Sequence, residues 1–263
     1  MSMTATSPPP TNWQASVAHA FSRAAPRYDA LANAQRHIGD TLWATLPDTA
    51  GLSLLDMGCG TGYWTQQLAA RYPHAHVTGL DIAPGMLAEA QARYGNHIRW
   101  QLGNAEALPF AAESFDLAFS NLAIQWCRDT GAVMNELQRV LAPGGQAHLM
   151  TLLPGTLAEV AHAWQRPEAL LQTPERNELA RAIDQSGLTP IHQQVERRRF
   201  HYPDLNAVMA SIKGVGAQVS RPHARRLTRR ELKAARERFE TLREPQGLPV
   251  SYLCFTLQLE KPS

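Results

Sequence analysis

The sequence predicts an α/β protein in which helices cover a mostly parallel β-sheet. Two observations support this fold class. A short apolar run at residues 52–57 has the length of a buried strand, and three glycines follow at alternate positions, Gly58, Gly60 and Gly62. Helix-like and strand-like segments then alternate up to residue 152, which is the pattern of βαβ units. We expect the glycine turn to place backbone N–H groups against a ligand at the carboxyl ends of the strands.

Composition limits the possible function classes. The chain has 263 residues and a formal net charge of +2, which does not favour nucleic-acid binding. It shows neither a secretory signal nor an apolar run long enough to span a bilayer, so we expect a cytoplasmic protein with no membrane partner. Cys59, Cys127 and Cys254 form no C-x-x-C pair, and we therefore expect neither a disulfide framework nor a metal site.

The first 152 residues divide into three predicted regions. Residues 1–14 are polar and proline-rich, which predicts a disordered tail. Residues 15–50 have near-helical apolar spacing, and Pro26 predicts a break between two short lid helices. Residues 51–152 form the predicted nucleotide-binding core. Its helices are expected at 62–71, 84–94 and 131–141, the last capped by Thr130, and its strands at 52–57, 75–80, 97–102, 114–121 and 146–152.

From residue 153 to 263 the pattern changes to inserted helices and two further strands. We expect Asp204 to cap one of these helices, and Thr228 with Glu231 to form a capping box at the start of another. The complete chain then has seven predicted strands. The helices are expected at 157–164, 175–185, 205–213 and from 228 to about 243, and the strands at 194–202 and 252–259.

The glycine spacing distinguishes between classes of nucleotide. Dinucleotide-binding loops have the spacing G-x-G-x-x-G, whereas this chain has G-x-G-x-G preceded by Asp56. A second acid, Asp81, ends the next strand about twenty residues later, where a carboxylate accepts hydrogen bonds from ribose hydroxyls. A ribose without a pyrophosphate indicates a nucleoside that carries another group. Taken alone, the glycines also fit a structural turn in an unrelated βαβ protein.

At these residues the sequence resembles the class I S-adenosylmethionine-dependent methyltransferases. Three further segments, 103–110, 114–121 and 137–145, follow in the order of that family's adenine-contacting turn, fourth strand, and helix and turn before the fifth strand. The resemblance implies a Rossmann-like class I methyltransferase fold with one antiparallel strand, and S-adenosylmethionine as cofactor. The cofactor-binding residues expected on this basis are Arg23, Asp56, Gly58, Gly60, Gly62, Asp81, Ile82, Met86, Asn104, Ala105 and Asn121.

Four other segments narrow the resemblance: 20–29, 120–127, 211–217 and 247–252. With them, residues 17–262 resemble the malonyl-[acyl-carrier protein] O-methyltransferases of biotin synthesis. This resemblance implies methyl transfer to the free carboxylate of a malonyl thioester on acyl-carrier protein, or on coenzyme A. One departure is Asn104, where that family usually has Asp. Its amide oxygen can still accept from the adenine amino group, so we expect weaker or rebalanced adenine binding and not its loss.

The resemblance also implies roles on the acceptor side. Tyr28 is the expected catalytic residue, a lid phenol that hydrogen-bonds near the transferring methyl group. A basic cluster at residues 221–238 is expected to attract the acidic carrier protein, and we expect the enzyme to be a monomer. Core packing is the alternative for Tyr28, Ile82 and Met86, and a solvated helix face is the alternative for the arginines. The expected substrate-binding residues are Arg27, Trp126, Arg225 and Arg229.

A malonyl carboxylate is ionised at neutral pH and attacks without a general base. The absence of an evident acid–histidine pair beside the glycines is therefore compatible with activity. Two rival functions stay open, namely methylation of another small acid or a quinone precursor, and cofactor binding without turnover. A carbon nucleophile requires a base near Asn121, and the sequence shows none. A nicotinamide-dependent dehydrogenase is the weakest alternative because of the glycine spacing.

Overall fold

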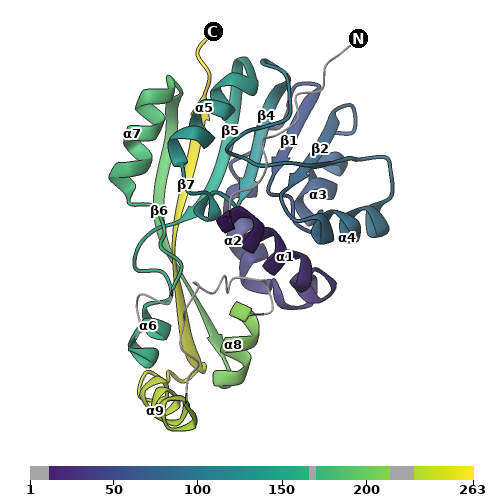
Figure 1. Cartoon of the computed structure of the whole chain (residues 1–263). Coiled ribbons are helices and arrows are strands. Elements are labelled where there is room, and N and C mark those ends of the chain that lie inside the picture. The colour runs from purple at the N-terminus through teal and green to yellow at the C-terminus, as the bar shows by residue number, and fades with distance from the viewer. Residues whose placement is uncertain (1–11, 166–169, 214–227) are drawn as a thin grey trace.

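Seven strands form one sheet in the order β3-β2-β1-β4-β5-β7-β6. The computed structural model describes residues 12–165, 170–213 and 228–263 (Figure 1). β7 is antiparallel to both of its neighbours and the other pairs are parallel. The predicted mostly parallel sheet with one antiparallel strand is therefore confirmed. The strands are β1 (Ser53–Met57), β2 (His76–Asp81), β3 (Arg99–Leu102), β4 (Phe115–Asn121), β5 (Leu141–Leu152), β6 (Thr189–Tyr202) and β7 (Leu248–Glu260).

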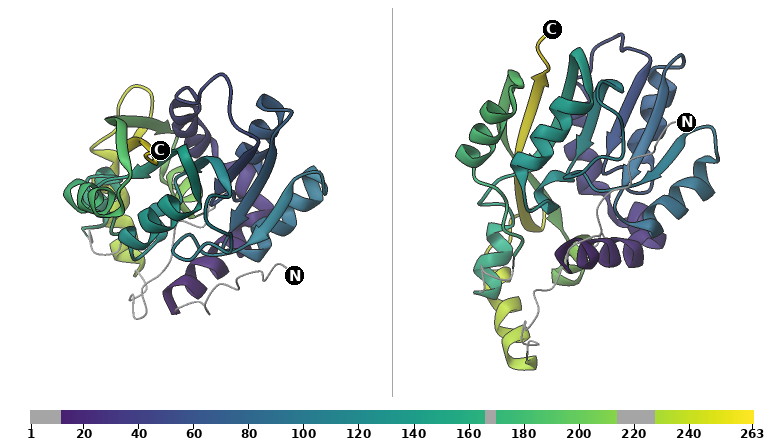
Figure 2. Two further views of the ribbon diagram at one scale, coloured as in Figure 1. Left: turned by 90° about the horizontal axis from the view of Figure 1, so that it is seen from above. Right: turned by 45° about the horizontal axis from the view of Figure 1, so that its top comes forward.

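Helices cover both faces of this sheet (Figure 2). Alternate residues of a strand point to opposite faces. Leu54 therefore packs with α2 and α3 on one side, and Leu55 packs with α5 and α7 on the other. The helices are α1 (Asn12–Leu31), α2 (Asn33–Trp43), α3 (Tyr63–Arg71), α4 (Pro84–Tyr94), η1 (Ile124–Trp126), α5 (Thr130–Val140), α6 (Ala158–Trp164), α7 (Arg176–Ser186), α8 (Leu205–Lys213) and α9 (Arg229–Glu240).

β6 and β7 extend past the carboxyl end of β5. Their pairing continues to Tyr202 opposite Leu248, whereas β5 pairs with β7 only as far as Leu152 opposite Cys254. Helices α6, α8 and α9 gather around this projecting part, at the bottom of Figure 1. We call β6, β7 and these three helices the extension. It stands at the carboxyl end of the sheet, where ligands bind in open α/β folds.

Two predicted boundaries in the N-terminal region differ from the structure. α1 continues through Pro26, and the break falls at Ala32. Pro26 is exposed, while Ala25 beside it is buried against α4, so packing offsets the lost backbone hydrogen bond. α1 also begins at Asn12, inside the segment predicted as a tail, of which residues 1–11 lie outside the described residues.

The capping predictions have mixed outcomes. The start of α5 is capped by Asp129, whose carboxylate accepts from the backbone N–H of Ala132 at 2.9 Å, and Thr130 is not the cap. Asp204 caps α8, and Thr228 forms the predicted capping box with Glu231. No helix in the described ranges combines the length and apolar character needed to cross a membrane.

Candidate functional site

The glycine turn between β1 and α3 requires glycine for two different reasons. Gly58, Gly60 and Gly62 all have left-handed backbone conformations, with φ of +81°, +55° and +84°. A Cβ at Gly58 would lie 2.2 Å from the Cβ of Ala123, so the protein itself needs glycine there. A Cβ at Gly60 would meet no atom within 4 Å and would enter open space. The turn therefore leaves Gly60 accessible to a ligand.

Two buried carboxylates lie close to the glycine turn. Asp81 ends β2 and accepts from the backbone N–H groups of Gly60 and Ala83, both at 2.8 Å. Asp56 lies in β1 and accepts from the hydroxyl of Thr65 at 2.6 Å. Burial raises the pKa of Asp56 to about 7, and it also raises the pKa of Asp81. A cationic ligand would stabilise both ionised forms, because buried anions without a nearby positive charge are unfavourable.

Helix α1 crosses the carboxyl ends of β1, β2 and β4 like a lid. At its start, the indole N–H of Trp13 donates to the backbone carbonyl of Trp126 at 2.9 Å. In its middle, the hydroxyl of Ser22 accepts from the backbone N–H of Gly85 at 3.1 Å. The right-hand view of Figure 2 shows α1 lying across this end of the sheet. The predicted lid is thus closed over the glycine turn.

Tyr28 lies on the inner side of this lid. Its side chain packs with Phe21 against a small cluster of Ala25, Ala83 and Met86, which joins α1 to α4. Burial, with a smaller contribution from the negative charge of Asp81, raises the pKa of Tyr28 to about 12. The phenol is therefore a hydrogen-bond donor at any working pH. Met86 packs in this cluster, which is the alternative role that the sequence offered for it. Its contact with a cofactor stays a prediction.

Two buried side-chain oxygens at the end of β4 have no hydrogen-bond partner among the described residues. Asn121 donates its amide N–H to the backbone carbonyl of Gln35 in α2 at 3.2 Å, which leaves Asn121 Oδ1 unpaired. The side-chain oxygen of Gln35 is unpaired as well. Buried acceptors are normally satisfied, so this pair suits a ligand that carries N–H donors. The methionyl amine of S-adenosylmethionine carries such donors. Asn121 was expected to bind the cofactor, whereas Gln35 was not identified from the sequence.

The predicted adenine turn follows β3. Asn104 Oδ1 accepts from the backbone N–H of Glu106 at 3.0 Å, so one of its lone pairs already stabilises the turn. The second lone pair stays available for an adenine amino group. Ala105 and Ile82 are half-buried near the ends of neighbouring strands. Their contacts with adenine stay predictions.

The expected substrate-side residues are not gathered in one place. Arg27 is exposed on α1, as is Arg23, which was expected on the cofactor side, and neither makes an ion pair with another described residue. Trp126 in η1 packs edge-on against Phe21 of the lid, with ring centroids 5.2 Å apart. Arg229 is exposed at the first turn of α9 in the extension, and Arg225 lies outside the described residues.

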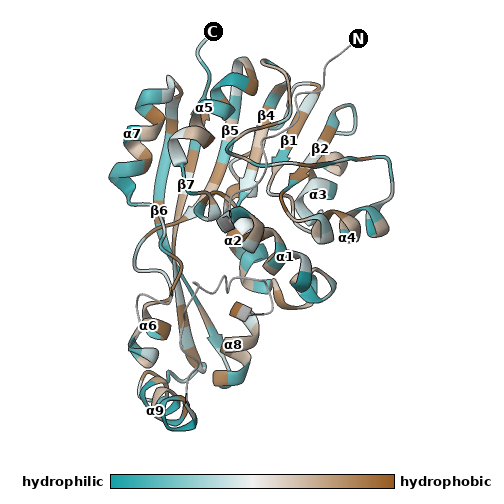
Figure 3. Ribbon diagram, in the orientation of Figure 1, coloured by the Kyte–Doolittle hydropathy of each residue, from teal (hydrophilic) through white to brown (hydrophobic). Residues whose placement is uncertain are grey.

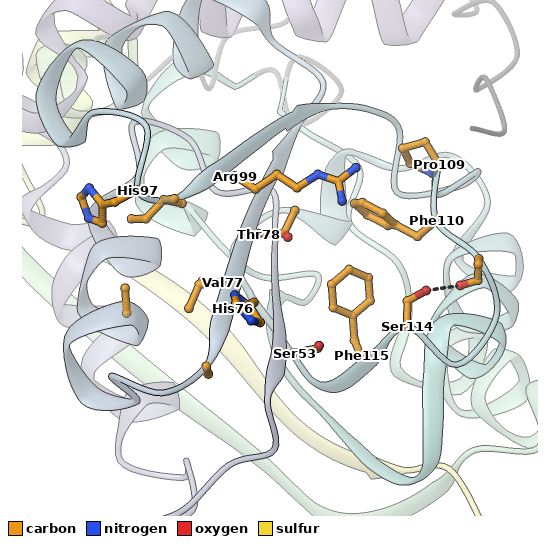
Figure 4. Close-up of a pocket in the computed structure, with 14 residues that line it drawn as sticks. Ser53, His76, Val77, Thr78, His97, Arg99, Pro109, Phe110, Ser114 and Phe115 are labelled. Atoms are coloured by element: carbon orange, nitrogen blue, oxygen red, sulfur yellow. Dashed lines mark hydrogen bonds between the residues drawn. The ribbon is translucent and has the colours of Figure 1, made fainter. Parts of the chain in front are cut away.

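A separate cavity lies at the opposite end of the sheet. It has a volume of about 580 Å³ and is lined by residues at the amino ends of four strands, including Ser53, His76, Arg99 and Phe115 (Figure 4). Neither the glycine turn nor the lid contributes to it. In the described part of the chain, no group of three or more metal-ligating side chains is present. The candidate site is therefore the carboxyl end, under α1.

Sequence reasoning missed the polar contacts that hold this site together. Asp29 contacts three other elements through Thr61, Arg36 and Arg93. Glu106 accepts from the backbone N–H of Asp129 at 2.9 Å and thereby joins the adenine turn to the segment before α5. Asp29 does end one of the quoted segments, directly after Tyr28. Its partners come from distant parts of the chain, and the sequence gives no signal of that convergence.

Comparisons with known proteins agree with this geometry. A family described as "Methyltransferase domain" matches residues 54–145. The malonyl-[acyl-carrier protein] O-methyltransferase of Dechloromonas aromatica is 37% identical over 91% of this chain and 91% of its own length. The enzyme of the same name from Serratia marcescens is 39% identical over 76% of this chain and 78% of its own. A biotin biosynthesis bifunctional protein of Cellvibrio japonicus is 41% identical over 94% of this chain, which spans 50% of that longer protein.

Solved structures share the fold. Geranyl diphosphate C-methyltransferase from Streptomyces coelicolor, in complex with S-adenosyl-L-homocysteine, superposes with a TM-score of 0.62 over 97% of this chain and 99% of its own. Its sequence identity of 16% makes this a likeness of fold alone. The assignment to a narrower enzyme family rests on the relatives at 37% and 39% identity. The chain belongs to the family of malonyl-[acyl-carrier protein] O-methyltransferases.

Proposed function

We propose that this protein transfers a methyl group from S-adenosylmethionine to the free carboxylate of a malonyl thioester on acyl-carrier protein, as a step of biotin synthesis. One observation carries the proposal beyond family membership. Two buried carboxylates, Asp56 and Asp81, lie close to the glycine turn, and Gly60 in this turn borders open space beneath α1. That combination suits a positively charged nucleoside held away from water.

The described residues fit this cofactor. Asp81 would hold the ribose, the turn from Gly58 to Gly62 would border the methionyl part, and Asn121 with Gln35 would accept from the ammonium group. When bound, S-adenosylmethionine supplies a methyl carbon already activated by a positive sulfonium, together with a neutral thioether leaving group. The protein then has to position donor and acceptor and to exclude water.

The acceptor needs little activation from the protein. A malonyl carboxylate is ionised at neutral pH, so one of its oxygens attacks without a base. Tyr28, protonated throughout the working range, is the proposed donor of a hydrogen bond near the transferred group. Methylation converts the anion into a neutral ester. That change suits enzymes whose pockets accept apolar acyl ends and reject charged ones.

The extension carries the surface that we propose for the carrier protein. Arg229, Arg230, Lys233 and Arg236 are all exposed on α9, and Figure 3 shows that most of this helix is hydrophilic. Lys233 and Glu237 approach to 3.9 Å, so part of the charge is balanced within the helix. The remaining positive charge suits an acidic partner and would accelerate its encounter.

The test combines the purified full chain with a methyl-labelled S-adenosylmethionine and malonyl-acyl-carrier protein, and the acyl product is weighed by mass spectrometry. We expect one labelled methyl group on the malonyl carboxyl and none on acetyl-carrier protein, which lacks that carboxyl. Label transferred to a quinone precursor or to free malonate, with none to the thioester, would replace this proposal by one of its rivals. Cofactor binding without turnover of any of these acceptors would make the protein a binding module.

A further inference from the structure

The carboxylate of Asp29 lies where four elements of the site meet. It belongs to the last turn of α1, and its side chain is only 15% exposed. Oδ1 accepts from the hydroxyl of Thr61 in the glycine turn at 2.8 Å and from Nη2 of Arg36 in α2 at 3.0 Å. Oδ2 forms an ion pair with Arg93 of α4. One side chain therefore joins the lid to the turn that borders the cofactor and to both flanking helices.

Because Asp29 directly follows Tyr28 in the chain, its contacts also constrain the position of Tyr28. The two residues are neighbours on α1, so contacts that hold Asp29 also hold the stretch of backbone that carries Tyr28, whose phenol lies close enough to Asp81 for that charge to raise its pKa. Asp81 itself accepts from the N–H of Gly60, the residue before Thr61. The glycine turn is thus held by two adjacent contacts, one from Asp81 of β2 to the backbone of Gly60 and one from Asp29 of the lid to the side chain of Thr61.

We propose that Asp29 is a positioning residue that fastens the lid helix to the glycine turn through Thr61, and that this link sets the turnover of the closed site. The expected effect on turnover rests on the proposed methyl transfer, whereas the expected effect on hydrogen–deuterium exchange of α1 does not. Asp29 touches no reacting atom. It acts by keeping α1 closed, so that Tyr28 stays over the site and water stays out.

Thr61 separates this role from simple structural support. Two arginines tie Asp29 to α2 and α4, whereas Thr61 is its described partner on the glycine turn. Thr61 is buried, and valine has nearly the same shape without the hydroxyl. Thr61→Val therefore removes the link and leaves both ion pairs, whereas Thr61→Ser keeps the hydroxyl as a matched control.

The experiment measures kcat, KM for the methyl donor, affinity for S-adenosyl-L-homocysteine, and hydrogen–deuterium exchange of α1 with that ligand bound. For Thr61→Val we expect kcat to fall about tenfold, the equivalent of one charge-assisted hydrogen bond, with faster exchange in α1. Thr61→Ser, which keeps the hydroxyl, should retain wild-type kcat and wild-type exchange in α1. Asp29→Ala should be at least as impaired, and adding Thr61→Val to it should cause no further loss, because the two residues share one interaction.

Two results would overturn the proposal. One is a Thr61→Val protein with wild-type kcat and wild-type exchange in α1. The other is an equal loss in Thr61→Val and Thr61→Ser, which would mean that packing rather than the hydroxyl matters. If methyl transfer to malonyl-carrier protein were absent altogether, exchange and ligand affinity would still decide the question. Failure of the proposed function is therefore distinguishable from failure of this inference.

Discussion

The two sides of the carboxyl end carry charges of opposite sign in opposite environments. Beneath the lid, Asp56 and Asp81 are buried, and Asp29 is nearly so. On the extension, Arg229, Arg230 and Arg236 of α9 are exposed. A buried charge acts strongly over a short range, whereas an exposed charge acts weakly, over a longer distance, and is screened by salt. The first arrangement suits tight capture of a small cation, and the second suits the approach of a large acidic partner.

The comparison also predicts how each side responds to mutation. Changes beneath the lid should alter affinity or turnover strongly and with little dependence on salt. Changes on α9 should alter KM for the carrier-bound substrate alone, by a smaller and salt-dependent factor.

Substitution of Gly60 should have the largest effect. In Gly60→Val the side chain would enter the open space beside Asp81, on a backbone with φ of +55°. We expect loss of S-adenosyl-L-homocysteine binding by about a hundredfold or more, since no rotamer clears the site. Gly187→Val is the matched control. Gly187 also has a positive φ and open space but ends α7, so it should lose stability and keep affinity. Unchanged affinity in Gly60→Val would contradict the assignment of the turn.

Removing the hydroxyl group of Tyr28 should lower turnover while the cofactor still binds. For Tyr28→Phe we expect kcat to fall by about tenfold, the value of one hydrogen bond in the transition state. Affinity for S-adenosyl-L-homocysteine should stay within about twofold, because the ring and its packing remain. Tyr94→Phe on α4 is the control and should be neutral. Wild-type turnover in Tyr28→Phe would place its hydroxyl outside the reaction.

Affinity for the cationic cofactor should depend on pH through Asp56. Its pKa is raised from 3.8 to about 7, so the carboxyl takes up a proton as the pH falls through neutrality and loses its attraction for a cation. Between pH 7.5 and pH 6 we expect affinity for S-adenosylmethionine to fall roughly eightfold. The same shift predicts that the unliganded protein loses stability as the pH rises from about 4 to about 7, because folding favours the protonated form.

Calorimetric titrations of wild type and Asp56→Asn across this range test the assignment. The variant should bind more weakly at pH 7.5, and its affinity should change little with pH. A wild-type profile that is flat between pH 6 and pH 7.5 would show that Asp56 does not titrate there.

Charge reversal in the basic cluster at residues 221–238 should have the smallest effect. For Arg225→Glu with Arg229→Glu we expect KM for malonyl-carrier protein to rise about threefold to tenfold at low salt, and less at high salt. KM for malonyl-coenzyme A should not change. Arg181→Glu on α7, at the far end of the sheet, is the control. Equal effects on both substrates would mean that α9 is a solvated helix that does not bind the carrier protein.

The cofactor side could be predicted from the sequence because its signals are local. The strand, the glycines and Asp81 lie within a short stretch of chain, and backbone geometry restricts what they can form. The helix from Pro84 to Tyr94 was predicted with its observed bounds, because proline and glycine mark its two ends.

What could not be predicted depends on contacts between distant segments. β6 begins at Thr189 and β7 at Leu248, earlier than their own residues suggest, because each strand is extended by pairing with the other. The uninterrupted course of α1 past Pro26 depends on packing against α4. Asp29 and Gln35 matter only through partners brought together by the fold, and their sequence context resembles that of any polar helix residue.

The most direct test of the central claim is calorimetry on the purified full chain at pH 7.5, with S-adenosyl-L-homocysteine in one titration and nicotinamide adenine dinucleotide in another. We expect saturable binding heat at one site for the first compound and no heat for the second. The reason is that the glycine turn and its two acids are spaced for a nucleoside without a pyrophosphate. Binding of the dinucleotide, with no heat from the homocysteine compound, would contradict it.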